Sequence, residues 1–146
     1  METLARVPGE LKAEPRWVCW RLVERDGRRT KMPIDARTGR MAKSTDPATW
    51  ATFEEAVAAR DRLGCSGVGF VFGSDRAYAG LDLDHVIHGG ALDGQYRWVV
   101  EQAGTYCEVS PSGDGLHLIF RGRKPEGAAR CHKGPWRCTT TTATSP

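Results

Sequence analysis

The chain has 146 residues, 40% of them hydrophobic, and a formal net charge of +3 from 21 basic and 18 acidic side chains. This length is sufficient for one core, and the charge is too small to indicate a nucleic-acid-binding protein by itself. No segment approaches the roughly 20 apolar residues of a membrane span, and the N-terminus lacks a secretory signal, so we expect a cytoplasmic protein without a membrane partner.

The first predicted elements form a basic hairpin. The residue pattern predicts a strand at 17–23 and a partner strand at 30–34, joined by a turn at 25–28. Pro33 cannot donate to a ladder, so the second strand is expected at the edge of a sheet. The hairpin is either a solvated surface or one that contacts phosphates, and its basic residues are Arg21, Arg25, Arg28, Arg29 and Lys31.

A helix follows with a clear start signal. Thr52 and Glu55 fit a capping box, in which the two side chains satisfy the free N–H groups of the first turn. An apolar stripe then predicts a helix that ends near Gly64. We expect Trp50 to pack against the entrance to this helix.

The second half of the chain alternates between apolar runs and turns. The run at 67–72 predicts a strand covered on both faces, and the strand at 79–86 is expected beside it. A polar break leads to a helix at about 95–103, and a hairpin then joins strands at 105–109 and 116–120. The residues expected to face inward or along the rim of that second helix are Trp98, Val99 and Gln102.

Two carboxylates lie two positions apart on the strand at 79–86. Successive side chains alternate faces in a strand, so Asp82 and Asp84 share one face, with about 6–7 Å between them along the strand. Two such acids can reach one cluster of cations, and oxygen ligands suit hard ions such as Mg²⁺ or Mn²⁺. An acid pair of this kind also occurs on solvent-facing strands without any function.

A glycine-rich turn precedes the last predicted strand. Ser112, Gly113 and Gly115 belong to a segment that favours tight turns, and His117 follows at the start of the strand. Backbone N–H groups in such a turn can form an anion-binding nest, while the serine hydroxyl and the imidazole can hydrogen-bond phosphate oxygens. An ordinary hairpin turn beside a histidine is the alternative. Glu108, on the strand that enters this turn, is either part of the site or a surface acid.

The two segments together resemble the archaeo-eukaryotic primase superfamily, especially the primase-polymerase domains of phages, prophages and plasmids. In that family a strand-borne Asp-x-Asp holds the catalytic metal ions, and a turn with a histidine binds the triphosphate of the incoming nucleotide. Asp82, Asp84 and His117 match those positions. The resemblance covers roughly residues 14–123, with a longer spacing from Ser112 to His117 and without the third acidic motif of the family.

The resemblance implies a template-dependent nucleotidyltransferase, a DNA primase/polymerase that uses two Mg²⁺ or Mn²⁺ ions. Its partners would be a single-stranded DNA template, nucleotide triphosphates and, in a longer protein, a helicase domain; the oligomeric state is left open. Asp82 and Asp84 would hold the metal ions. The nucleotide would be bound by His117 and Lys31, which is otherwise an ordinary edge lysine. Its other expected ligands are Ser112, Gly113 and Gly115.

The expected fold is α+β, with a mixed, mainly antiparallel sheet that presents the carboxylates and helices packed on its other face. We expect a catalytic core at residues 1–130, incomplete at its C-terminal end. Residues 131–146 show neither strand alternation nor helical periodicity, so we expect a tail that is disordered or encoded in a shifted reading frame.

Two other functions are compatible with the same residues. The chain could be an inactive prophage remnant that binds single-stranded nucleic acid, because two carboxylates without a third hold metal ions weakly. It could also be a metal-dependent phosphoesterase, although it lacks the additional His and Asp ligands that such sites usually gather.

Overall fold

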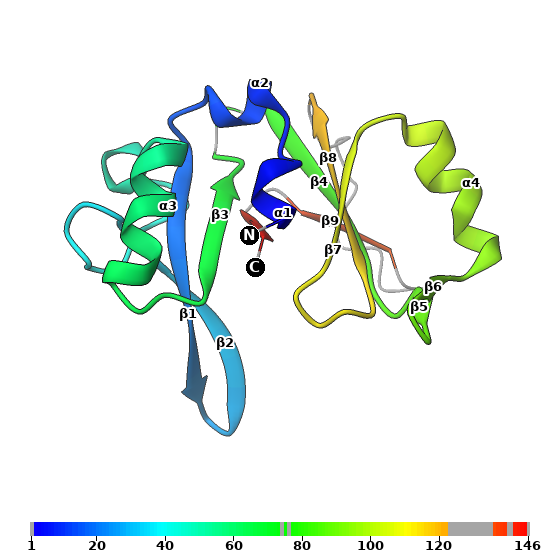
Figure 1. The fold of residues 1–146 in the computed structure, drawn as a ribbon, viewed down its shortest axis with the longest axis horizontal. Coiled ribbons are helices and arrows are strands. Elements are labelled where there is room, and N and C mark those ends of the chain that lie inside the picture. The colour runs from blue at the N-terminus through cyan, green and yellow to red at the C-terminus, as the bar shows by residue number, and fades with distance from the viewer. Residues whose placement is uncertain (1, 74, 76, 123–135, 140–141, 146) are drawn as a thin grey trace.

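The computed structural model describes residues 2–73, 75, 77–122, 136–139 and 142–145. It has the expected α+β character, but its main strands form two four-stranded sheets (Figure 1). The first sheet has the strand order β10-β3-β1-β2 and the second has the order β7-β8-β4-β9. The pairings within the described part of the chain are all antiparallel, in agreement with the expected mainly antiparallel strands, and they are divided between separate sheets.

The strands of the first sheet are β1 (Trp17–Arg25), β2 (Arg28–Ile34), β3 (Gly67–Val71) and β10 (Thr142–Ser145). Those of the second sheet are β4 (Tyr78–Leu83), β7 (Tyr106–Val109), β8 (Leu116–Arg121) and β9 (Trp136–Thr139). A small hairpin joins β5 (Ile87–His88) to β6 (Ala91–Leu92). The helices are α1 (Glu2–Ala5), α2 (Gly9–Lys12), α3 (Phe53–Arg62) and α4 (Gly94–Ala103), with a 3₁₀ turn η1 (Pro47–Thr49).

The hairpin β1–β2 forms as the sequence predicts. Asp26 and Gly27 both have left-handed backbone angles, with φ of 53° and 71°. Two central residues of this kind make a turn whose twist matches that of the strands. β2 lies at the edge of its sheet, so the N–H group that Pro33 lacks is not needed to pair with a further strand. The end of the hairpin projects beyond the rest of the fold in Figure 1.

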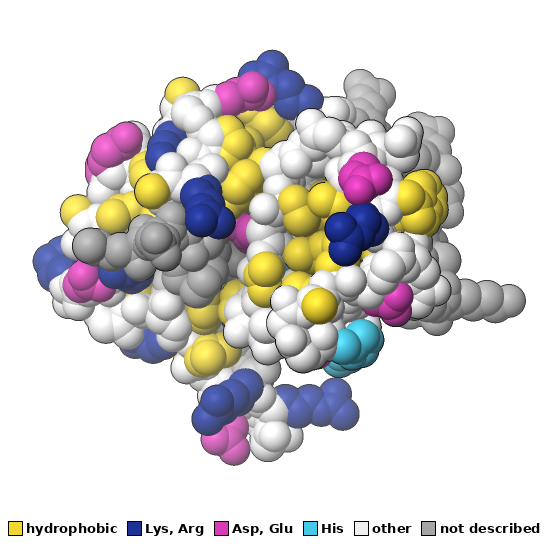
Figure 2. Space-filling view, turned by 45° about the vertical axis from the view of Figure 1, so that its right-hand side comes forward, with side chains coloured by type: hydrophobic (Ala, Val, Ile, Leu, Met, Phe, Trp, Pro, Cys, Tyr) yellow, Lys and Arg dark blue, Asp and Glu magenta, His cyan; other side chains and the backbone are white. Residues whose placement is uncertain are grey.

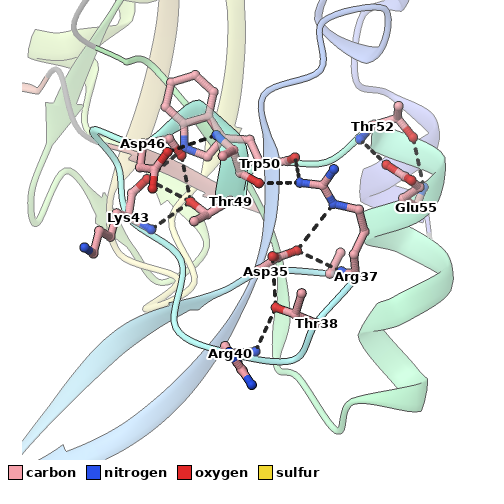
Figure 3. A network of polar contacts seen from close by, with 12 residues as sticks. Asp35, Arg37, Thr38, Arg40, Lys43, Asp46, Thr49, Trp50, Thr52 and Glu55 are labelled. Atoms are coloured by element: carbon pink, nitrogen blue, oxygen red, sulfur yellow. Dashed lines mark hydrogen bonds and ion pairs between the residues drawn. The ribbon is translucent and has the colours of Figure 1, made fainter.

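The capping box of α3 is also confirmed. The backbone N–H of Glu55 donates to the Thr52 hydroxyl, and the Glu55 carboxylate accepts from the Thr52 N–H at 2.8 Å. Trp50 is buried and its indole N–H donates to the Lys43 carbonyl, within the polar network shown in Figure 3. Asp35, nearby in this network, accepts from the Arg37 N–H and the Thr38 hydroxyl. Burial opposes ionisation of Asp35, but these hydrogen bonds outweigh it, so its pKa is lowered.

Two further expectations need correction. β3 pairs with β1 and β10, so it is not the neighbour of β4. Trp98 is 59% exposed on α4 and Gln102 is exposed too, whereas Val99 is buried. β9 and β10 lie within residues 131–146, the segment expected to be a disordered or frameshifted tail, and each pairs with one of the two sheets, while residues 123–135 lie outside the described part of the chain.

The two sheets share one hydrophobic core. The segment that contains the first two helices places Leu4 of α1, Val7 of the connecting turn and Leu11 of α2 in this core. It also contains Trp17 and Phe70 of the first sheet and Tyr78 and Ile119 of the second. A smaller cluster packs α4 against the second sheet through Val99, Leu83 and Leu118. None of the described helices combines the length and the apolar character needed to cross a membrane.

Candidate functional site

Three ionisable side chains lie in a row across neighbouring strands of the second sheet. Asp82 of β4 is directly opposite His117 of β8, and His117 is directly opposite Glu108 of β7. Residues opposite one another across an antiparallel ladder share a face, so all three project to the same side. The His117 Nε2 lies 3.9 Å from an Asp82 oxygen, and its Nδ1 lies 3.3 Å from a Glu108 oxygen. The expected approach of Asp82 to the imidazole is therefore present.

Glu108 is a buried acid rather than a surface one, with 3% of its side chain exposed. One carboxylate oxygen faces His117 Nδ1 and the other accepts from the Tyr106 hydroxyl at 3.0 Å. A buried carboxylate is costly unless such partners satisfy it. A carboxylate can only accept, so a proton on Nδ1 would be donated to Glu108, and Nε2 is turned toward Asp82.

Lys31 reaches the same place from the first sheet. Its ammonium lies 4.9 Å from the centre of the Trp20 ring, on the hairpin face where Trp20 and Lys31 are diagonal neighbours. Lys31 is exposed, yet desolvation lowers the pKa of its ammonium; the charges of Glu108 and Asp82 oppose this shift. Lys31 of β2 is therefore within the electrostatic reach of the acids of β4 and β7.

Asp84 lies just outside the strand on which the sequence pattern placed it. β4 ends at Leu83, and His85, directly after Asp84, has a left-handed φ of 55°. Asp84 is half-buried and has interactions of its own. The two aspartates provide the oxygen donors that Mg²⁺ or Mn²⁺ prefers. Within the described residues, however, no three His, Cys, Asp or Glu side chains are grouped closely enough to hold a metal ion by themselves.

The glycine-rich turn is occupied by its own hydrogen bonds. The Gly113 N–H donates to the Ser110 carbonyl, and the Gly115 N–H donates to the Ser110 hydroxyl. Ser112 donates to Asp114, which also contacts His85 at 2.6 Å. In this structure the Gly113 and Gly115 amides and the Ser112 hydroxyl each have a partner within the turn.

The turn instead fixes the end of β8 against the end of β4. Val86 and Ile87 both donate backbone N–H groups to the Asp114 carbonyl. A Cβ added at Gly115 would lie 2.7 Å from the Leu83 carbonyl oxygen, so only glycine permits this approach. The turn thus holds in register the two strands that carry Asp82 and His117.

Of the residues predicted for the site, Asp82 and His117 lie opposite one another, and Glu108 lies beside His117. Lys31 is linked to them only through the charges of Asp82 and Glu108. Sequence reasoning left the role of Glu108 open, although one signal was available. A hairpin that pairs Val109 with Leu116 must also pair Glu108 with His117, since opposite positions step outward together from the turn. Tyr106, two positions before Glu108, lies on the same face and completes the contact.

No family model matches the chain. It is 38% identical over 112 residues to a protein of Nitratiruptor phage NrS-1 that is named DNA primase-polymerase. The match covers 75% of this chain but spans only 15% of the phage protein. Across these residues the chain is related to a phage-type primase-polymerase domain.

Proposed function

We propose that this chain is part of a template-dependent nucleotidyltransferase, a DNA primase/polymerase domain that acts on nucleotide triphosphates. The observation that carries this proposal is the row of Asp82, His117 and Glu108 across three strands of the second sheet, with the charges of Asp82 and Glu108 acting on Lys31 of the first sheet. Carboxylates beside cationic or hydrogen-bonding groups form a site for a triphosphate and its metal ions. The relationship to a DNA primase-polymerase supports the same function.

Asp82 and Asp84 would hold Mg²⁺ or Mn²⁺, with phosphate oxygens and water completing the ligands. Bound there, the ions would lower the cost of forming a 3′ alkoxide and of releasing pyrophosphate. This division of ligands agrees with the absence of a self-sufficient three-residue metal group among the described side chains. It also means that metal binding should depend on the nucleotide.

Lys31 and His117 would bind the phosphates. The proton that His117 shares with Glu108 leaves Nε2 directed toward the site, 3.9 Å from Asp82. Donation from Nε2 to a phosphate oxygen needs a second proton on the ring, so we expect the imidazolium form in the complex. The Lys31 ammonium adds a second positive group. Because the amides of the glycine-rich turn are engaged internally, we assign Ser112, Gly113 and Gly115 a positioning role.

The test is nucleotide incorporation on a single-stranded template with Mg²⁺ or Mn²⁺. Asp82→Asn keeps the shape of the side chain but removes its charge, so we expect at least a hundredfold loss of incorporation with little change in thermal stability. The matched control is Asp61→Asn, an exposed aspartate of α3 that pairs with Arg60. Retained incorporation by Asp82→Asn would remove this residue from the mechanism. A wild-type chain that binds template without any incorporation would instead be a non-catalytic binder.

A further inference from the structure

The charge of the molecule is concentrated on the outer half of the hairpin β1–β2. Between residues 21 and 31 the chain carries five basic and two acidic side chains, an excess equal to the +3 of the whole protein. Residues 24–31 are all exposed, and Leu22 is 45% exposed. Figure 2 shows dark-blue basic side chains gathered on the projection at the bottom of the molecule.

The arrangement of these charges has a cost for folding. Arg25 and Arg28 are directly opposite one another in the ladder, and like charges in such a pair are destabilising. Among the described residues, no carboxylate lies within ion-pair distance of Arg25, Arg28 or Arg29. Binding of a polyanion would relieve this repulsion, whereas the repulsion has no benefit for a hairpin that only faces solvent.

One face of the hairpin continues the candidate site. Residues two apart on a strand share a face, so Lys31 and Arg29 of β2 lie on the same side as Leu22 of β1, which is opposite Lys31. Glu24, opposite Arg29, is also on this face, whereas Arg25 and Arg28 lie on the other face of the exposed end. The charges of Asp82 and Glu108 act on the Lys31 ammonium at the inner end of this face. The row therefore runs from the site, through Lys31 and Leu22, to Arg29 at the exposed end.

We propose that the exposed end of this hairpin, which carries Arg25, Arg28, Arg29 and Lys31, binds the backbone of single-stranded nucleic acid. The inference rests on the proposed function, because a template-dependent nucleotidyltransferase acts on single-stranded nucleic acid. Basic side chains would contact successive phosphates, and the apolar Leu22 would lie against sugar or base. Such contacts release counterions, so binding should be strongly dependent on salt and largely independent of sequence.

The experiment measures binding of the whole chain to a fluorescein-labelled oligo-dT of twenty nucleotides by anisotropy at several salt concentrations. We expect the variant Arg28→Gln/Arg29→Gln to bind about tenfold more weakly near 0.1 M salt. The slope of log K against log salt should become shallower by about 1.4, or about 0.7 for each lost phosphate contact. The thermal midpoint should stay the same or rise, since Arg28 no longer faces Arg25.

The matched control is Arg6→Gln/Arg97→Gln, which removes the same charge from exposed positions outside the hairpin. We expect it to retain nearly all of the affinity and the full salt slope. Equal weakening by both variants, an unchanged slope in the hairpin variant, or tighter binding to duplex of the same length would each overturn the proposal. Asp82→Asn distinguishes the hairpin proposal from the proposed function, because this variant should abolish incorporation but bind the oligonucleotide normally. The hairpin proposal can therefore be refuted while the proposed function stands.

Discussion

Glu108 shows how a single residue can organise the site without facing solvent. Its carboxylate is satisfied by the Tyr106 hydroxyl on one oxygen and by His117 on the other. An aliphatic residue would fill such a position at lower cost, because burying a charge is unfavourable even when it is paired. The position of the acid behind the imidazole is explained if it orients the ring and stabilises its charged form.

Glu108→Gln should therefore act on nucleotide binding more than on turnover. The amide keeps the size of the side chain and one acceptor oxygen, but it loses the charge that stabilises an imidazolium. We expect the KM for the nucleotide to rise about tenfold, in line with the roughly 1.5–3 kcal/mol of a hydrogen bond to a charged group, with a smaller change in kcat. Steady-state incorporation at a series of nucleotide concentrations measures both.

A purely structural role for Glu108 would give a different pattern. Loss of stability alone would lower the active fraction, and hence kcat, without moving KM. The matched control is Glu101→Gln on the exposed side of α4, which should leave both constants unchanged. An unchanged KM in Glu108→Gln would contradict the orienting role.

At the scale of elements, the sequence predicts what depends on local chemistry. The left-handed turn at Asp26 and Gly27 and the capping box of α3 each need only a few adjacent residues, and both are present as predicted. The partner of β3 was not predictable in this way. All five residues of β3 are buried, so its apolar run shows that the strand is covered but not by which neighbours.

Gly115 tests how the turn supports the site. Its Cα approaches the Leu83 carbonyl so closely that Gly115→Ala must shift backbone, because the contact is not with a flexible side chain. We expect a loss of about 1–3 kcal/mol in the free energy of unfolding and a misaligned Asp82–His117 pair. Denaturant unfolding and the incorporation assay should both show the effect.

The control for this change is another glycine without such a neighbour. Gly94, the first residue of α4, has nothing within 4 Å of an added Cβ and no left-handed φ. Gly94→Ala should leave the stability unchanged or raise it by about 0.5–1 kcal/mol. If Gly115→Ala were as harmless as Gly94→Ala, the turn would not be holding the two strands together.

At the scale of the whole molecule, the row of Asp82, His117 and Glu108 belongs to the second sheet, and Lys31 is the predicted site residue that belongs to the first. Asp82 and His117 were recognisable from the sequence, since their motifs lie on strands that pair directly. Lys31 remained open because its strand belongs to the other sheet, about fifty positions from Asp82 along the chain. Only the packing of one sheet against the other decides whether such a lysine meets the acids.

That packing depends on the first residues of the chain. Leu11 is buried between the sheets: its carbonyl accepts from the Trp17 indole of β1, and its side chain lines a pocket with Tyr78 and Ile119 of the second sheet. Since one core joins both sheets, we expect them to unfold in a single transition. Cys19 lies on β1 of the first sheet and Cys107 on β7 of the second, so labelling of the two thiols reports on the two sheets separately. Burial raises the pKa of each thiol, to about 12 for Cys19, so each should react slowly while its sheet is folded.

Leu11→Ala should consequently weaken both sheets by the same amount. Removing a buried leucine side chain costs about 2–5 kcal/mol, and here the cavity would lie where the sheets meet. Thiol labelling in increasing denaturant, read by mass spectrometry of peptides, should show Cys19 and Cys107 becoming reactive together and at a lower midpoint than in the wild type. Leu22→Ala, at a position 45% exposed, should move neither midpoint appreciably. A variant in which Cys19 alone shifts would show that the sheets are independent, and the geometry that brings Lys31 to Asp82 would then lack a common core to maintain it.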